Sequence, residues 1–115
     1  RLRQIRMQRS RERMMQAVPT ADVVITNPTH FAVALSYKPE TMEAPVLVAK
    51  GQDLIAQRIR SIAEENDIAI VENPPLARAL HATVDLDQEV PAEHFEAVAQ
   101  VISYVFNLKG RRMPT

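Results

Sequence analysis

The hydrophobic pattern of this chain changes its period several times along the sequence, and each change predicts a new element. Consecutive or alternating apolar residues, typical of β-strands, occur at 22–26, 30–37, 46–49 and 68–71. Segments with helical spacing or composition occupy 1–16, 51–65, 73–82 and 91–108. The order predicts an α/β fold with a four-stranded mixed sheet, about four flanking helices and a protruding N-terminal linker helix.

The strand predicted at 22–26 is expected to lie in the middle of the sheet. Its three consecutive β-branched residues indicate burial on both faces. The turn at 27–29 leads from it into the second strand. The strand–helix–strand succession over 46–71 predicts a right-handed parallel crossover. Its helix is expected to carry Leu54, Ile55, Ile59 and Ile62 on one face.

Composition divides the chain into three parts. Residues 1–18 are expected to form a basic linker helix, 19–108 a globular domain and 109–115 a basic tail. The apolar stripe of the first helix is thin and irregular, which suits a linker better than a core. The helix is expected to end at Pro19. Because the chain starts inside a polar helical pattern without an initiator Met, we expect it to be part of a longer protein.

The formal net charge of zero conceals two basic ends and an acidic body. Residues 1–13 carry six arginines against Glu12, and the body between the two ends carries a net charge of −8. The arginines suggest either nucleic acid or an anionic membrane surface as the partner. The acidic body and the lack of interleaved aromatic residues favour the membrane surface, at about 1 kcal/mol for each charge near it.

The composition also limits the possible chemistry. With 115 residues and 46% hydrophobic content, one small core is expected. The absence of Cys excludes disulfides, thiolate nucleophiles and zinc–thiolate sites. The three His residues lack metal-ligand spacing, and the acidic loop at 85–89 is expected to be solvated. We therefore predict no metal and no cofactor.

The Asn27–Pro28 dipeptide has two interpretations. It is an ordinary turn sequence, since both residues favour turns. It is also a candidate for scission of the backbone, because Pro28 has no N–H and cannot support the usual deamidation of Asn27. The side-chain nitrogen of Asn27 can instead attack its own main-chain carbonyl carbon and expel Pro28 as an amine. Thr29 would fix the turn, and His30 would either relay a proton or point into solvent.

A second Asn–Pro dipeptide, Asn73–Pro74, supplies an internal comparison. Asn73 is predicted to cap the helix at 73–82, which turns its side-chain oxygen toward the first N–H groups of that helix. Its amide nitrogen then points away from the main-chain carbonyl. We expect the Asn73–Pro74 bond to stay intact.

The final helix is more apolar than a helix with one buried face needs to be. Its apolar residues span roughly 200°, against about 100° for a typical surface helix. They are Phe95, Val98, Ala99, Val101, Ile102, Val105, Phe106 and Leu108. Either the helix packs between two elements, or one flank forms a shallow apolar patch for partners. The patch would comprise Ala44, Pro45, Ala99 and Ile102.

Residues 27–30 match the NPTH signature of the FlhB/YscU/EscU/SpaS family, the self-cleaving switch proteins of type III secretion. The chain also resembles the flagellar branch of that family at 13–15, 18–19, 21–35, 44–45, 48–51 and 74–80. The resemblance implies a membrane domain ahead of this chain and a position at the cytoplasmic face of the bacterial inner membrane. It implies single-turnover autocatalytic cleavage between Asn27 and Pro28, not a turnover enzyme, with Asn27, Pro28, Thr29 and His30 as the reactive residues.

The resemblance further implies a switch in the class of exported protein, from rod and hook subunits to filament-type subunits. The implied partners are these export substrates, a hook-length control protein and other components of the export gate. Two alternatives remain open. One is an injectisome homologue with the same autocleavage, and the other is an α/β protein-binding module that does not cleave itself.

Overall fold

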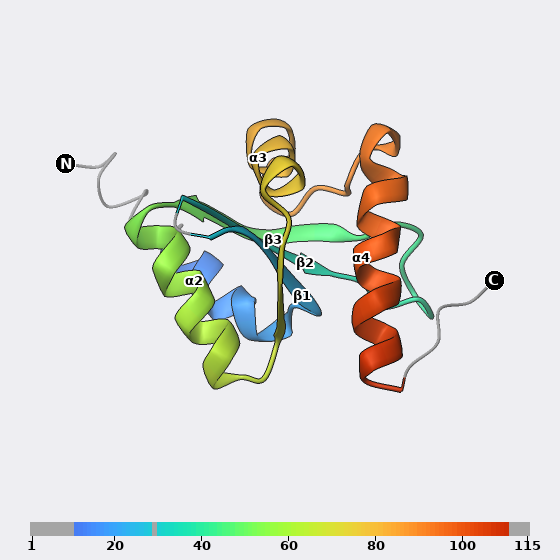
Figure 1. Ribbon diagram of the computed structural model, residues 1–115, viewed down its shortest axis with the longest axis horizontal. Coiled ribbons are helices and arrows are strands. Elements are labelled where there is room, and N and C mark those ends of the chain that lie inside the picture. The colour runs from blue at the N-terminus through green and yellow to red at the C-terminus, as the bar shows by residue number, and fades with distance from the viewer. Residues whose placement is uncertain (1–10, 29, 111–115) are drawn as a thin grey trace.

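A four-stranded mixed sheet with the order β3-β2-β1-β4 forms the centre of the molecule (Figure 1). The computed structural model describes residues 11–28 and 30–110. The strands are β1 (Val23–Asn27), β2 (Phe31–Ser36), β3 (Val46–Gln52) and β4 (Ala69–Glu72). β2 pairs antiparallel with both β1 and β3, and β4 pairs parallel with β1. The predicted α/β fold with a mixed sheet is confirmed.

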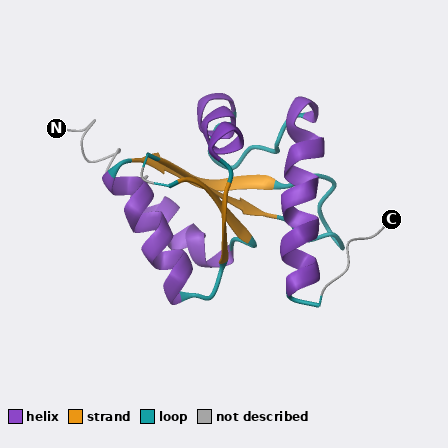
Figure 2. Ribbon diagram, in the orientation of Figure 1, coloured by secondary structure: helices purple, strands orange, loops and turns teal. Residues whose placement is uncertain are grey.

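Helices cover both faces of this sheet (Figure 2). On one face lie the helical residues 11–17, the 3-10 turn η1 (Val18–Thr20) and α2 (Leu54–Glu65). On the other lie α3 (Pro74–Thr83) and α4 (Phe95–Leu108), which follows the short 3-10 turn η2 (Ala92–His94). Each face therefore has its own hydrophobic core.

β1 contributes to both cores, as its run of β-branched residues predicts. Val23 and Ile25 point into the core under α3 and α4, and Val24 points into the core under α2. All three side chains are fully buried. The start of the strand is fixed by Asp22, whose carboxylate accepts from the Lys38 ammonium at 2.8 Å.

The helical residues 11–17 depart from the expectation that the N-terminal helix does not suit a core. Met14 and Met15 are buried beside Val18 and Val24. Long, unbranched methionine side chains reach the core even from a thin apolar stripe. The division into linker, globular domain and tail stays a prediction, and 1–10 and 111–115 lie outside the described residues.

α2 begins later than the sequence predicts, because β3 continues to Gln52. The expectation that Leu54 shares a face with Ile55 and Ile59 is wrong, since Leu54 is 78% exposed. Ile59 is fully buried and Ile55 is partly buried, as expected. The hydrophobic period predicts the buried face within the helix but not where the chain turns from strand to helix.

Gly51 lets α2 pass close to β3. A Cβ atom at position 51 would lie 2.1 Å from Cγ2 and 2.7 Å from Cβ of Ile55. The second of these atoms is next to the helix backbone and cannot rotate away. Gly51 is therefore needed for the close packing of α2 on the sheet.

Lys50, the residue before Gly51, ties β3 to the end of α3 on the opposite face of the sheet. Its ammonium donates to the carbonyls of His81 and Val84, each at 2.9 Å. A positive charge at this position favours the C-terminal end of the helix. The His81 ring packs against Phe31, with ring centroids 4.8 Å apart. Burial, and then the charge of Lys50, lower the pKa of His81 below its usual 6.5.

We predict that Gly51→Ala lowers the free energy of unfolding by about 1–3 kcal/mol, because the new methyl group overpacks against Ile55. Urea denaturation measures the change. In a double-mutant cycle, Ile55→Ala relieves part of the clash, so the double variant loses less than the sum of the two single losses. Strict additivity would contradict the steric explanation.

We predict that the free energy of unfolding falls as the pH is lowered from about 7.5 through 6.5, partly because of His81. The pKa of His81 is lower in the folded than in the unfolded chain, so the unfolded chain binds more protons in this window. Urea denaturation at several pH values gives the slope, and His81→Gln makes it shallower. An equal slope in the wild type and the variant would contradict the prediction.

Candidate functional site

Asn27 is the last residue of β1, and Pro28 follows it in the turn to β2. Asn27 pairs with Phe31 at the end of the antiparallel ladder. The N–H of His30 donates to the main-chain carbonyl of Asn27 at 2.8 Å, which closes a β-turn. Asn27 and Pro28 are both half-buried. Thr29 lies outside the described residues, so its predicted role stays a prediction.

The hydrogen bond from His30 falls on the carbonyl that cyclisation would attack. Attack on the carbon moves negative charge onto that oxygen, and a backbone N–H already in place stabilises the charge as it develops. The turn therefore supplies an electrophile with one preformed donor. This donor is the main chain of His30, a contribution that the sequence does not reveal.

The side chain of His30 is 68% exposed and lies near Asp53, with 3.7 Å between Nδ1 and Oδ1. The N–H of Asp53 also donates to the carbonyl of His30 at 3.0 Å. Asp53 adopts a φ of +53°, in the region that usually favours glycine. The junction of β3 and α2 is thus attached to His30 through the backbone. The exposed ring fits the solvent-facing alternative, and the proton-relay role stays a prediction.

Arg60 of α2 reaches the other residue of the candidate scissile bond. Its Nη1 atom donates to the carbonyl of Pro28 at 2.5 Å. Sequence reasoning missed both Arg60 and Asp53. Arg60 follows Pro28 by 32 positions, and only the packing of α2 on the sheet brings the two together.

Asn73 caps α3, as its sequence context predicts. Its Oδ1 atom accepts from the N–H of Leu76 at 3.3 Å. The register pairs Thr26 with Glu72, so Asn27 and Asn73 are the next residues on two adjacent parallel strands. The two Asn–Pro dipeptides therefore lie side by side, where the parallel strands β1 and β4 end. They differ in which oxygen of Asn accepts a hydrogen bond: the side-chain Oδ1 at Asn73 and the main-chain carbonyl at Asn27.

The four predicted patch residues come together at the other end of the sheet. Ala44, Pro45, Ala99 and Ile102 line a shallow hollow of about 170 Å³, together with Tyr37, Glu43 and Phe95. Ala99 is exposed, whereas Ile102 is 1% exposed and belongs to the core. One side of α4 is thus packed, and a flank near Phe95 stays open.

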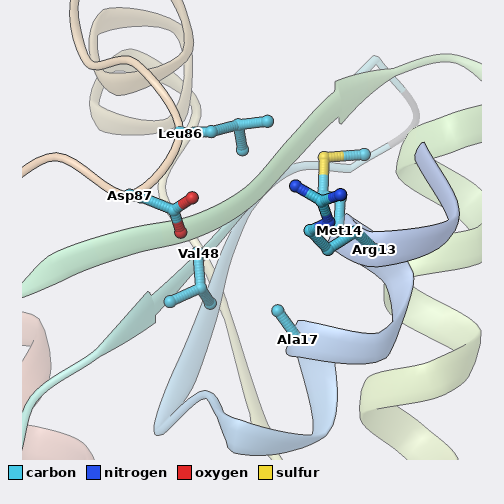
Figure 3. Close-up of a pocket in the computed structure, with 6 residues that line it drawn as sticks. All are labelled: Arg13, Met14, Ala17, Val48, Leu86 and Asp87. Carbon is cyan, nitrogen blue, oxygen red and sulfur yellow. The ribbon is translucent and has the colours of Figure 1, made fainter. Parts of the chain in front are cut away.

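A second hollow lies between the helical residues 11–17, β3 and the acidic loop (Figure 3). Arg13, Met14 and Ala17 line it from the helix, Val48 from the strand, and Leu86 and Asp87 from the loop. Arg13 and Asp87 lie on different sides of it (Figure 3). The sequence did not indicate this hollow.

Across 11–28 and 30–110, no helix is long and apolar enough to cross a membrane.

The sequence matches known proteins over most of its length. The pattern of the FlhB HrpN YscU SpaS family matches residues 1–105. The chain is 55% identical over 108 residues to the flagellar biosynthetic protein FlhB of Bacillus subtilis, which covers 90% of this chain and 30% of that protein. Identity to the Escherichia coli FlhB is 47% over 113 residues, or 98% of this chain and 30% of that protein. The chain thus spans about 30% of the length of these relatives.

Solved structures agree with this similarity. The cytoplasmic domain of FlhB from Shewanella putrefaciens matches with a TM-score of 0.81 and 48% identity, over 91% of this chain and 84% of that one. The C-terminal domain of EscU, in an asparagine-to-alanine variant, matches with a TM-score of 0.77 and 33% identity, over 80% of this chain and 92% of that one. Since sequence and fold agree over most of its residues, the chain belongs to the FlhB HrpN YscU SpaS family.

Proposed function

We propose that this chain is part of a flagellar type III export component that cleaves its own backbone between Asn27 and Pro28 and so switches the class of exported protein. One observation carries the cleavage proposal: the carbonyl of Asn27 is held by the N–H of His30, in a turn where Pro28 has no N–H. The flagellar part is supported by the similarity to flagellar biosynthetic proteins.

The reaction needs no cofactor and no added reactant. The side-chain nitrogen of Asn27 forms a bond to its own main-chain carbonyl carbon, and a five-membered succinimide closes. The bond from that carbon to the Pro28 nitrogen breaks, and its electron pair stays on nitrogen. The proton lost by the attacking amide ends on this nitrogen, so Pro28 becomes a free secondary amine. Water later opens the succinimide.

Each chain performs this reaction once, so the protein is not a turnover enzyme. The rate depends on how well the turn holds the attacking geometry, because both reacting groups belong to one residue. Asn73 has the same following Pro74, but its Oδ1 atom is directed to the N–H of Leu76. The cap keeps its amide nitrogen from the main-chain carbon, and the Asn73–Pro74 bond stays whole.

The two pieces are expected to stay together after the cut. β1 lies on the N-terminal side of the cut, and its side chains are buried in both cores. Its hydrogen bonds to β2 and β4 do not depend on the scissile bond. The cut therefore removes one covalent connection in a turn and leaves the sheet in place.

The position and partners follow from the same proposal. The chain would lie at the cytoplasmic face of the bacterial inner membrane, with its basic N-terminal segment near anionic lipid. Rod, hook and filament subunits, a hook-length control protein and other export-gate components would be its partners. The hollow lined by Ala44, Pro45, Ala99 and Ile102 is apolar and open on one flank, which suits a short apolar segment of an exported subunit.

We predict that the purified wild-type chain separates into two fragments on a denaturing gel, one ending at Asn27 and one beginning at Pro28. Mass spectrometry then finds no fragment that ends at Asn73. Asn27→Ala abolishes the cut because it removes the nucleophile, whereas Asn73→Ala leaves it unchanged and lowers stability by about 1 kcal/mol through loss of the cap. A wild-type chain that stays intact after long incubation at neutral pH would contradict the proposal and favour a non-cleaving binding module.

We predict that Ala99→Glu weakens binding of a purified flagellar hook or filament subunit by about tenfold, because it places a charge in an apolar hollow. Isothermal titration measures the affinity. Tyr104→Glu is the matched control, since Tyr104 is 58% exposed on the same helix and does not line the hollow. Unchanged affinity in Ala99→Glu, with normal folding, would show that the hollow is not the binding surface.

A further inference from the structure

Arg60 places a positive charge on the turn that contains the scissile bond. Its Nη1 atom donates to the carbonyl of Pro28, the residue that leaves as an amine in the proposed reaction. Arg60 belongs to α2, whose Ile59 is fully buried against the sheet. The guanidinium therefore comes from a packed helix and does not belong to the turn itself.

The contact fixes the one soft backbone dihedral that Pro28 has left. The pyrrolidine ring sets φ of Pro28, and the peptide bond to Asn27 is planar. Only ψ remains free, and a hydrogen bond to the carbonyl of Pro28 holds it. On the other side of the scissile bond, the N–H of His30 holds the carbonyl of Asn27. The peptide plane that must be attacked is thus clamped from both sides.

The arginine is not explained by an ion pair. Within 11–28 and 30–110, no carboxylate lies within salt-bridge distance of Arg60. Its Nε atom is buried without a hydrogen-bond partner among these residues. A buried donor without a partner destabilises the fold, and native proteins retain few of them. The hydrogen bond from Nη1 to the carbonyl of Pro28 partly offsets the cost of the unpaired Nε atom.

We propose that Arg60 is a positioning residue for cleavage of the Asn27–Pro28 bond, an inference that rests on the function proposed above. It holds Pro28 so that the Asn27 carbonyl carbon stays open to its own side chain. Its charge-assisted hydrogen bond also draws electron density from Pro28. That makes it easier for the Pro28 nitrogen to depart with the electron pair of the broken bond.

The test follows the cut in newly made chains, since each chain reacts once. Cell-free synthesis with a short radioactive pulse gives the fraction cleaved against time on a denaturing gel. Arg60→Met keeps most of the apolar stem of the side chain and removes its donors, and we expect it to slow cleavage by tenfold or more. Arg60→Lys keeps a charged donor and recovers part of the rate. Arg58 is an exposed residue of the same helix, so Arg58→Met serves as the control and should cleave at the wild-type rate.

A second measurement separates positioning from general destabilisation. Urea denaturation is carried out in the Asn27→Ala background, where every chain is uncut. Ile59→Val lowers the unfolding midpoint by removing a buried methyl group on the same helix, yet it should leave the cleavage rate unchanged. Slower cleavage in Ile59→Val, in proportion to lost stability, would show that Arg60 acts only through the fold.

The outcomes distinguish this inference from the proposed function. Wild-type cleavage together with equally fast cleavage in Arg60→Met would overturn the role of Arg60 and leave the function standing. A wild type that never cleaves would overturn both. Slow cleavage in Arg60→Met, partial recovery in Arg60→Lys and a normal rate in Arg58→Met would support the role of Arg60.

Discussion

The burial of β1 on both of its faces is the constraint on which the rest of the structure depends. Its side chains enter two separate cores, and its backbone forms hydrogen bonds with β2 on one side and β4 on the other. A strand held in this way has little freedom to shift, twist or fray. Asn27 ends it, so the residue that would react lies at the end of a strand that is held on both faces and by both neighbouring strands. The strand places the turn, and hydrogen bonds from His30 and Arg60 then hold the carbonyls of Asn27 and Pro28.

The two Asn–Pro dipeptides share a sequence but differ in geometry. They follow adjacent parallel strands and lie at the same edge of the sheet. At Asn73 the side chain accepts a hydrogen bond from the first turn of α3. This bond restricts the side-chain rotation that cyclisation would need. At Asn27 the main-chain carbonyl accepts a hydrogen bond instead, which favours attack on it. One dipeptide caps a helix, and the other has the arrangement that the proposed cleavage requires.

Local features predicted much of this from the sequence. The central place of β1 followed from consecutive β-branched residues, and the cap at Asn73 from an Asn before two prolines. The grouping of Ala44 with Ala99 followed from an over-wide apolar helix face. Arg60 and Asp53 could not be found in this way, because their contacts depend on how α2 packs on the sheet. Leu54 was misplaced for a related reason: the period does not say where β3 ends.

The geometry also limits how the proposed cut could change the choice of exported proteins. The turn lies where β2 begins, whereas the hollow at Tyr37 and Pro45 lies where β2 ends and β3 begins. A six-residue strand separates them by about 20 Å. Because the ladders on either side of β2 do not include the scissile bond, the cut has no direct route to the shape of the hollow. The proposed cut would change the turn itself, where Pro28 would become a charged chain end beside the Arg60 guanidinium. Two neighbouring positive charges repel each other, so the reaction would weaken the contact between Arg60 and Pro28. A switch based on such a cut would therefore act through partners that contact the turn between β1 and β2.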